Sequence, residues 1–332
     1  MCRPRSSFLR TLMAALSGLV LCNTVMAQPD SWEIKRNVVY GTGIVAASSK
    51  PFEQELTLDA YIPKTSGTRA ILRPAVILAF GGAFHRGEKG DFQFSEDGAS
   101  DSSMADYCAA LARRGFACFS IDYRLVPDDP ALPNGLDERI LMPKMLLKNP
   151  TITGRIEFVR QKMGLPSLDD KSREQLWNAT FAAVHDMETA LDFVRANAQG
   201  FNVDPNKIAL GGFSAGAITA INLAYGKRAE VQAVIAFSGT SWGYDLTKTL
   251  SKDAPPLLQF AGQWDLPGIR LGSAGIANLF QSRGARLSQA WVPGFGHFYP
   301  MEAPSLAAQF DQQSIIDRVI TFLNETLGVT EP

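Results

Sequence analysis

The stretch Lys207–Gly216 reads K-I-A-L-G-G-F-S-A-G and is the most informative part of the chain. An apolar run typical of a buried strand enters a tight turn, and a helical pattern follows from Ala215. Because Gly212 and Gly216 have no Cβ atoms, the turn can be sharp enough to hold the Ser214 hydroxyl out over the sheet edge. The turn is also a helix N-terminus, where unpaired N–H groups favour a developing negative charge. We therefore predict a nucleophilic serine on a parallel sheet.

Strand-like and helix-like stretches alternate on both sides of this turn. Apolar and polar residues alternate from about Val38 to Pro63, which predicts half-buried antiparallel strands. The continuous apolar run Pro74–Ala79 predicts a strand covered on both faces. Further strands are predicted at Ala117–Tyr123, Lys207–Gly211, Val231–Phe237, Leu257–Ala261 and Leu287–Val292, and helices at Met104–Arg114, Phe181–Ala196, Ala215–Tyr225, Leu271–Arg283 and Ile315–Leu323. This repetition predicts an α/β fold with a mostly parallel central sheet and helices on both faces.

Residues 126–175 interrupt the alternation and contain no predicted strand. Three prolines are followed by amphipathic pieces rich in Met and Leu, and apolar residues recur at helical spacing at Ile152, Ile156, Val159 and Met163. We interpret this segment as a small helical cap over the ends of the strands. Its apolar stripe either packs the cap onto the body or lines a substrate pocket.

The first 27 residues have the pattern of a cleaved secretory signal. Three arginines precede the apolar stretch Leu12–Val25, and Ala27 ends a suitable cleavage site before Gln28. The apolar stretch is short for a membrane span, and no later run reaches about 18 apolar residues. We expect an exported chain of residues 28–332, periplasmic or secreted, with no stable membrane insertion. Acylation of Cys22 in a lipoprotein is the alternative.

The charge of the exported chain bears on its partners, and its cysteine content bears on whether it contains a disulfide. Its 29 basic and 33 acidic residues form no basic stripe, so no nucleic-acid partner is expected. Only Cys108 and Cys118 remain in it, and the predicted helix and strand place each about 10 Å from the turn at Gly115. The sequence favours a disulfide between them in an oxidising compartment, and two buried thiols are the alternative.

Three histidines remain in the exported chain, so the base for Ser214 can be sought by elimination. His297, in G-F-G-H-F, directly follows a predicted strand, at the edge where open α/β sheets build their sites. His185 lies inside a predicted helix and is expected to pack or to cap. His85 follows a glycine-rich loop and has either a substrate-facing or a structural role. We therefore predict that His297 is the general base.

An acid must orient that imidazole, and two backbone donors must bind the oxyanion. Asp265 follows the strand that precedes the histidine strand, whereas the competing acids Asp245 and Glu302 do not follow a strand end so directly. The loop F-G-G-A-F follows the strand Pro74–Ala79 and offers the N–H groups of Gly82 and Ala83 as partners for that of Ala215.

These motifs resemble those of the α/β-hydrolase superfamily, near its carboxylesterase and hormone-sensitive-lipase-like branches. F-G-G-A-F corresponds to the family's H-G-G-G, I-D-Y-R-L to its D-Y-R-L, and G-F-S-A-G to its nucleophile elbow, and Asp265 and His297 then follow in the family's order. The resemblance implies the α/β-hydrolase fold, a triad of Ser214, Asp265 and His297, an oxyanion hole from Gly82, Ala83 and Ala215, structural supports at Asp122, Tyr123 and Arg124, and no cofactor or metal.

The chain departs from the family pattern at three positions. Phe80 replaces the usual histidine and Ala83 the third glycine, but only side chains change there, so the backbone donors are retained. Phe213 stands where lipase-like relatives often have an acid, which leaves the branch open. The long insertion after D-Y-R-L leaves the size of the substrate open as well.

The expected function is that of an exported serine carboxylic-ester hydrolase that acts through an acyl-enzyme. Its substrate would be a small-molecule or polymer-linked ester, and the acyl group, the alcohol group and the oligomeric state are left open. Candidate pocket walls are Phe84, Trp242 and Trp264, with Met142 and Met145 of the cap. One alternative is a secreted serine peptidase of the oligopeptidase-like branch, although neither an extra domain nor acids for a substrate amine are evident. The other is an inert binding protein on a hydrolase scaffold, although all three triad members are present.

Overall fold

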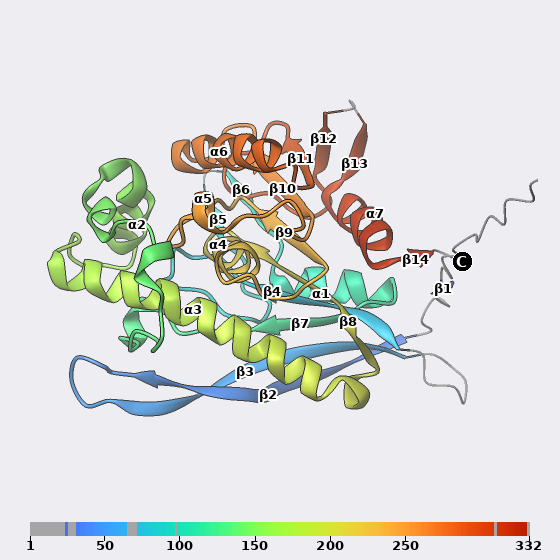
Figure 1. The fold of residues 1–332 in the computed structure, drawn as a ribbon, viewed down its shortest axis with the longest axis horizontal. Coiled ribbons are helices and arrows are strands. Elements are labelled where there is room, and N and C mark those ends of the chain that lie inside the picture. Colours follow the sequence, from blue (N-terminus) through green and yellow to red (C-terminus); the bar gives the residue numbers. More distant parts are fainter. Residues whose placement is uncertain (1–23, 26–30, 65–71, 97, 309–310, 331–332) are drawn as a thin grey trace, which may run out of the picture.

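The computed structural model describes residues 24–25, 31–64, 72–96, 98–308 and 311–330 (Figure 1). Most of the predicted signal segment 1–27 therefore lies outside the described residues. Its described part, β1 (Thr24–Val25), pairs in parallel with β14 (Val329–Thr330). None of the helices in the described ranges is both long and apolar enough to cross a membrane.

A ten-stranded sheet forms the centre of the described chain, in the order β13-β12-β11-β10-β9-β8-β4-β7-β3-β2. The six strands from β11 to β7 are parallel to one another, and antiparallel strands lie at both edges. The strands are β2 (Ser31–Val45), β3 (Phe52–Lys64), β4 (Arg73–Ala79), β7 (Ala117–Ile121), β8 (Val203–Phe213), β9 (Ala233–Phe237), β10 (Leu257–Gly262), β11 (Leu287–Val292), β12 (Pro304–Ala307) and β13 (Gln312–Ser314). The predicted mostly parallel sheet is confirmed.

Helices cover both faces of the sheet because the first step between parallel strands runs toward one edge of the sheet and the later steps run toward the other edge. The step from β4 to β7 goes one way, and the steps from β8 to β9 and from β10 to β11 go the other way. Right-handed connections therefore place α1 (Met104–Arg113) on one face, and α4 (Ala215–Ile221) and α6 (Pro267–Arg283) on the opposite face. Helix α7 (Ile315–Leu327) packs beside α1, and α3 (Asp170–Ala196) packs beside α4 (Figure 1). Strands β4, β7, β9 and β10 are buried along their whole length, as their continuous apolar runs predict.

The segment predicted as a cap contains short helices between β7 and β8. They are η1 (Val126–Asp128), η2 (Glu138–Ile140), η3 (Lys144–Lys148) and α2 (Pro150–Lys162). Helix α3 begins at Asp170, well before the predicted start at Phe181, so residue 175 lies inside it. Its first turns are polar in sequence, and a capping box between Asp169 and Ser172 starts the helix there.

The remaining elements are short. They are the hairpin of β5 (Ser95–Glu96) and β6 (Ala99–Ser100), the turns η4 (Ala198–Phe201) and η5 (Asn222–Gly226), and helix α5 (Leu246–Thr249). Neither this hairpin nor the edge strands β12 and β13 can be recognised in the sequence, because strands of two to four residues are too short to show an alternating pattern.

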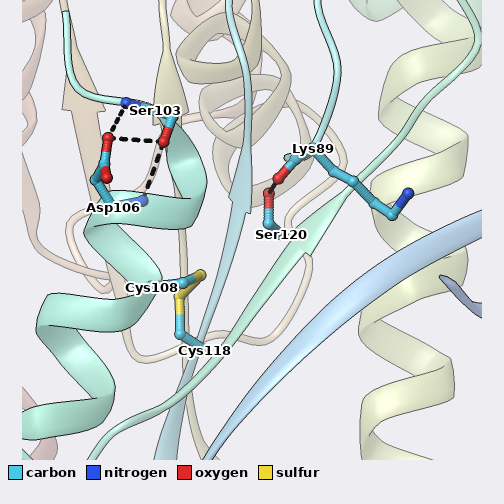
Figure 2. The surroundings of a disulfide bond; sticks show 6 residues. All are labelled: Lys89, Ser103, Asp106, Cys108, Cys118 and Ser120. Atoms are coloured by element: carbon cyan, nitrogen blue, oxygen red, sulfur yellow. Dashed lines mark hydrogen bonds between the residues drawn. A yellow bond between two sulfur atoms is a disulfide. The ribbon is translucent and has the colours of Figure 1, made fainter. Parts of the chain in front are cut away.

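Cys108 on α1 and Cys118 on β7 are joined by a disulfide (Figure 2). Both residues are fully buried, so the bond attaches the helix to the sheet from within the core. The same helix starts with a capping box, in which Ser103 N–H donates to Asp106 Oδ2 at 2.9 Å and Asp106 N–H donates to Ser103 Oγ at 3.1 Å.

Replacing both cysteines by alanine is expected to lower the free energy of unfolding by about 3 kcal/mol, because the short loop between them is then no longer closed in the unfolded chain. Urea unfolding with and without dithiothreitol measures this. Reductant should shift the wild-type midpoint and leave the midpoint of the Cys108→Ala/Cys118→Ala variant unchanged. Equal midpoints for reduced and oxidised wild-type protein, with the free thiols counted, would contradict the prediction.

Candidate active site

Ser214 lies on the turn between β8 and α4, in a backbone conformation that few non-glycine residues adopt. Its φ is 51° and its ψ is −111°, and its N–H donates to Phe237 O at 2.8 Å. A Cβ atom on Gly216 would lie 2.0 Å from Ala79 O, and one on Gly212 would lie 2.5 Å from the same oxygen. The two glycines therefore permit the turn, which leaves Ser214 partly exposed between buried neighbours.

The structure brings Ser214, His297 and Asp265 together from three loops. His297 Nε2 lies 3.0 Å from Ser214 Oγ, and His297 Nδ1 lies 2.7 Å from Asp265 Oδ1. The histidine and the aspartate are both buried. Because a carboxylate only accepts hydrogen bonds, Nδ1 carries the proton and Nε2 is free to accept one from the serine hydroxyl.

The loops that carry Asp265 and His297 are in direct contact. They follow the adjacent parallel strands β10 and β11, and a Cβ atom on Gly262 would lie 1.8 Å from Gly296 O. Only a glycine fits this approach. The Asp265 carboxylate also accepts the N–H of Leu266 at 2.7 Å and that of Gly262 at 3.2 Å.

Two hydroxyls that the sequence did not lead us to expect, those of Ser238 and Tyr299, form a hydrogen-bonded series that ends on Asp265. Ser238 Oγ is 2.5 Å from Asp265 Oδ2 and 2.8 Å from the Tyr299 hydroxyl, and both residues are fully buried. A hydroxyl has one proton, so a serine that donates to the carboxylate accepts from the tyrosine. Burial, and then the Asp265 charge, raise the pKa of Tyr299 well above its usual value, which keeps the phenol a donor. The one available signal was that Ser238 directly follows the predicted strand 231–237.

The loop after β4 has three successive residues with positive φ: Gly82 at 112°, Ala83 at 56° and Phe84 at 61°. A Cβ atom on Gly82 would lie 1.9 Å from a backbone oxygen, and one on Gly81 would lie 3.3 Å from Ser214 Cβ, so the loop passes directly beside the serine. Within the described residues, the N–H groups of Gly82, Ala83 and Ala215 have no hydrogen-bond acceptor. They are available to bind an oxyanion.

Tyr123 stabilises the start of this loop. Its hydroxyl donates to Phe80 O at 2.8 Å, and the two rings stack with centroids 4.4 Å apart. Burial raises the pKa of Tyr123, so its hydroxyl stays protonated and continues to donate. The aromatic residue at position 80 thus packs against the tyrosine of the D-Y-R-L motif.

The neighbours of Tyr123 make polar contacts with two further elements. The Asp122 carboxylate accepts the backbone N–H of Lys89 at 2.9 Å and its Nζ at 2.9 Å. Arg124 forms a buried ion pair with Asp186 of α3, with Nη2 2.6 Å from Oδ1. These contacts attach the glycine-rich loop and α3 to the same end of β7.

The competing candidates lie elsewhere or have other partners. His185 is on α3 with its side chain 46% exposed, and Asp245 caps α5 by accepting the N–H of Thr247 at 3.2 Å. Glu302 is exposed. His85 is buried beside the loop and contacts Ala83 O rather than Ser214.

The candidate pocket residues differ in how far their side chains are buried. Phe84 is buried edge-on to Tyr123, and Trp242 is buried edge-on to Trp177. Trp264 is 66% exposed beside Asp265. Of the two cap methionines, Met142 packs against the core and Met145 is exposed.

Metal ligands do not gather anywhere in the described ranges, since these contain no group of three or more His, Cys, Asp or Glu residues that could hold an ion. The groups that the structure brings together at the site are the serine, the imidazole, the carboxylate and the three backbone N–H groups. Together they can perform nucleophilic attack, proton transfer and stabilisation of an oxyanion.

Comparison with known proteins shows which fold this is. The family model BD-FAE matches residues 157–251, which include Ser214. No curated protein matches the chain. Similar solved structures include a truncated carbohydrate esterase from gut microbiota, with 18% identity, 92% of this chain and 99% of that chain covered and a TM-score of 0.55.

Two more structures are similar over most of their length. Thermogutta terrifontis esterase 2 phosphorylated by paraoxon has 17% identity, 91% of this chain and 97% of that chain covered, and a TM-score of 0.55. The hydrolase MGS-M1, from a Medee basin deep-sea metagenome library, has 15% identity, 91% and 100% coverage and a TM-score of 0.54. At such identities the likeness shows the fold, and it confirms the α/β-hydrolase fold that the sequence motifs predict.

Proposed function

We propose that this chain, which has the α/β-hydrolase fold, is a serine hydrolase of carboxylic esters. The observation that carries the proposal is the continuous series of hydrogen bonds from Ser214 Oγ through His297 to Asp265. The available N–H groups of Gly82, Ala83 and Ala215 beside the serine support it. Further support comes from the printed names of the similar structures, which include a carbohydrate esterase and a bacterial esterase.

The proposed reaction has two halves. His297 Nε2 takes the Ser214 proton as Oγ forms a bond to the ester carbonyl carbon, and the oxygen that becomes negative accepts hydrogen bonds from the backbone N–H groups. The alcohol then leaves with the proton from His297. Water, deprotonated by the same imidazole, attacks the acyl-enzyme; the bond from the acyl carbon to Ser214 Oγ breaks, His297 returns the proton to Oγ, and the acid is released. Asp265 keeps the proton on Nδ1 and stabilises the imidazolium in both halves.

Labelling with a fluorophosphonate tests the nucleophile. Ser214 Oγ should form a bond to phosphorus as fluoride leaves and His297 takes the hydroxyl proton, which gives one adduct per chain. Intact-mass measurement and peptide mapping locate the adduct. The expected result is an adduct confined to the peptide that contains Ser214; an unlabelled protein, or an adduct on another residue, would overturn the assignment.

A matched pair of substrates tests the bond that is broken. Short-chain aryl esters should be turned over, and anilides with the same acyl group should react at least about 10³-fold more slowly, because the amide leaving group is far poorer. Comparable rates for anilides would instead indicate the peptidase alternative.

Export is a second part of the proposal. The charged and apolar pattern of residues 1–27 supports it, and so does the Cys108–Cys118 disulfide, a bond that persists mainly in oxidising compartments. N-terminal sequencing of the protein recovered from the periplasm or the medium should give Gln28 as the first residue. Recovery of the uncleaved chain in the cytosol would contradict this.

Ser238→Ala is expected to lower kcat for an aryl ester by about 10-fold, because Asp265 loses a buried charge-assisted hydrogen bond. Tyr299→Phe should have a smaller effect, since it removes only the donor to Ser238. Steady-state kinetics per titrated active site measure both. Ser282→Ala, at an exposed serine of α6, is the matched control, and a Ser238→Ala enzyme no slower than this control would show that the hydroxyl does not support Asp265.

A further inference from the structure

The loop beside Ser214 has a backbone that needs support from its surroundings. Ala83 and Phe84 have φ values of 56° and 61°, a left-handed conformation that is strained for residues other than glycine. Two backbone hydrogen bonds contribute to this support: His85 N–H donates to Gly82 O at 3.0 Å, and Val126 N–H donates to Phe84 O at 2.7 Å. The carbonyl between them, that of Ala83, has a side chain as its partner.

That side chain is the imidazole of His85. Its Nδ1 lies 2.8 Å from Ala83 O, and its Nε2 lies 3.2 Å from Nη1 of Arg160. A carbonyl only accepts and a guanidinium only donates, so the two partners independently require a proton on Nδ1 and a lone pair on Nε2. Burial lowers the pKa of His85, the bond to Ala83 O opposes that shift, and the Arg160 charge adds to it. The neutral imidazole is therefore the stable form.

Arg160 belongs to α2, the longest helix of the segment predicted as a cap, and is 5% exposed. Its Nε donates to Pro166 O at 2.9 Å, which fixes the plane of the guanidinium. Among the described residues, no carboxylate oxygen lies within ion-pair distance of it, although the Ser172 hydrogen bonds, helped by its charge, lower the pKa of Asp169. The buried guanidinium thus has neutral groups as its direct partners, the His85 ring and the Pro166 carbonyl.

The same helix contacts the rest of the site through one more residue. Arg155 Nη2 donates to Glu96 Oε2 at 2.5 Å, and Glu96 also pairs with Arg86, which lies two residues after the glycine-rich loop. The Arg155 guanidinium lies 5.3 Å from the centre of the Phe298 ring, next to His297 in the chain. Helix α2 thus lies against both the glycine-rich loop and the histidine loop.

We propose that His85 and Arg160 are positioning residues for the oxyanion hole: Arg160 of α2 orients the imidazole, and the imidazole holds the Ala83 carbonyl and with it the left-handed conformation of Ala83. Holding this carbonyl fixes ψ of Ala83. If Ala83 relaxed out of the left-handed region, its φ would change as well, and the preceding peptide, which carries the Ala83 N–H, would shift relative to the oxyanion. The inference rests on the proposed function and adds to it that the cap helix sets the geometry of the catalytic loop.

Substitutions at His85 separate the two halves of this contact. Asparagine can place an amide N–H where Nδ1 is and so retains the donor to Ala83 O, whereas glutamine reaches the position of Nε2 and retains only the contact with Arg160. His85→Ala removes both. Arg160→Met removes the donor from α2 and keeps a side chain of similar length. His185→Asn on α3 and Lys162→Met on α2, both at exposed positions, are the matched controls.

The measurement is kcat and KM for p-nitrophenyl acetate per active site, with sites counted by fluorophosphonate titration and the unfolding temperature recorded for each variant. His85→Ala should lower kcat by about 10- to 100-fold with KM within about 3-fold of wild type, because an oxyanion donor acts in the transition state. His85→Asn should recover to within about 3-fold of wild-type kcat, and His85→Gln should not. The kcat of Arg160→Met should lie between those of His85→Ala and His85→Asn, and both control variants should have the wild-type kcat.

A purely structural role predicts a different pattern. It would lower the unfolding temperature and the number of titratable sites, but leave kcat per site unchanged, and His85→Asn would be no more active than His85→Gln. Either an unchanged kcat per site or equal activity of these two variants would overturn the inference. If His85→Ala does not fold, the comparison of asparagine with glutamine and the Arg160→Met variant still decide the question. Wild-type protein that is neither labelled nor active would refute the proposed function itself, which is a separate outcome.

Discussion

Ser214→Ala is expected to lower kcat for a short-chain aryl ester by about 10⁵-fold or more, while the protein folds normally. The methyl group cannot form the acyl-enzyme, and His297 is left with no hydroxyl to deprotonate. Binding and the backbone N–H groups remain, so a small residual rate above that in water is expected. The fold should survive because the substitution removes one partly exposed oxygen from a turn that the glycines on either side define.

Single-turnover and steady-state kinetics, with circular dichroism as the folding check, measure this loss. Ser282→Ala is the matched control, because its hydroxyl lies on the exposed side of α6 and donates only to Leu279 O. A Ser214→Ala protein that retains more than about 1% of wild-type turnover, free of contaminating wild-type enzyme, would eliminate Ser214 as the nucleophile.

Asp265→Asn should lower kcat by about 10⁴-fold, although the two side chains have nearly the same shape. An amide N–H in place of Oδ1 would face Nδ1 of His297 and require a lone pair there, so the imidazole proton moves to Nε2. A protonated Nε2 in the neutral ring cannot accept the Ser214 proton. Ser238 Oγ and the N–H of Gly262 both donate to Oδ2, which favours the amide oxygen at that position and places the amide nitrogen where Oδ1 was.

Asp245→Asn provides the control for this change, since Asp245 caps α5 through the N–H of Thr247 and does not contact the triad. It should change kcat by less than about 2-fold. If Asp265→Asn lost no more activity than Asp245→Asn, the orienting carboxylate would have to be another residue.

The positions of the triad loops could be predicted from the sequence because each follows a recognisable strand. Residues 208–210 before Ser214 and residues 257–261 before Asp265 are largely apolar, the strand before His297 is partly exposed, and parallel strands bring their carboxyl ends to one edge of the sheet. The spatial order of β8, β9, β10 and β11 then matches their order in the chain. Strand ends and residue type together were enough for these three side chains.

The residues that support the triad could not be predicted in the same way. Ser238 and Tyr299 are ordinary residues until the fold brings them within 2.8 Å of each other, and nothing in their sequence neighbourhood indicates that contact. The role of His85 depends on Arg160, which is 75 residues away on a helix whose placement no local pattern determines. Such contacts follow from tertiary packing, which sequence periodicity does not encode.

The candidate pocket residues show a related limit of composition-based reasoning. Phe84, Trp242 and Trp264 are candidates for pocket walls because each lies in the glycine-rich loop or in a segment that follows a strand. Phe84 and Trp242 point into the core, and Trp264 points outward. Proximity in sequence to a proposed catalytic residue therefore did not determine the side on which the ring lies.

The covalent bond between α1 and β7 has a practical consequence for anyone who prepares this protein. Batches made in a reducing cytosol and batches refolded in air contain two chemically different molecules of identical sequence, one with a pair of thiols in its core and one with a cross-link. Melting temperatures from two such preparations are comparable only after the thiols have been counted, and a mixed batch should melt in two steps.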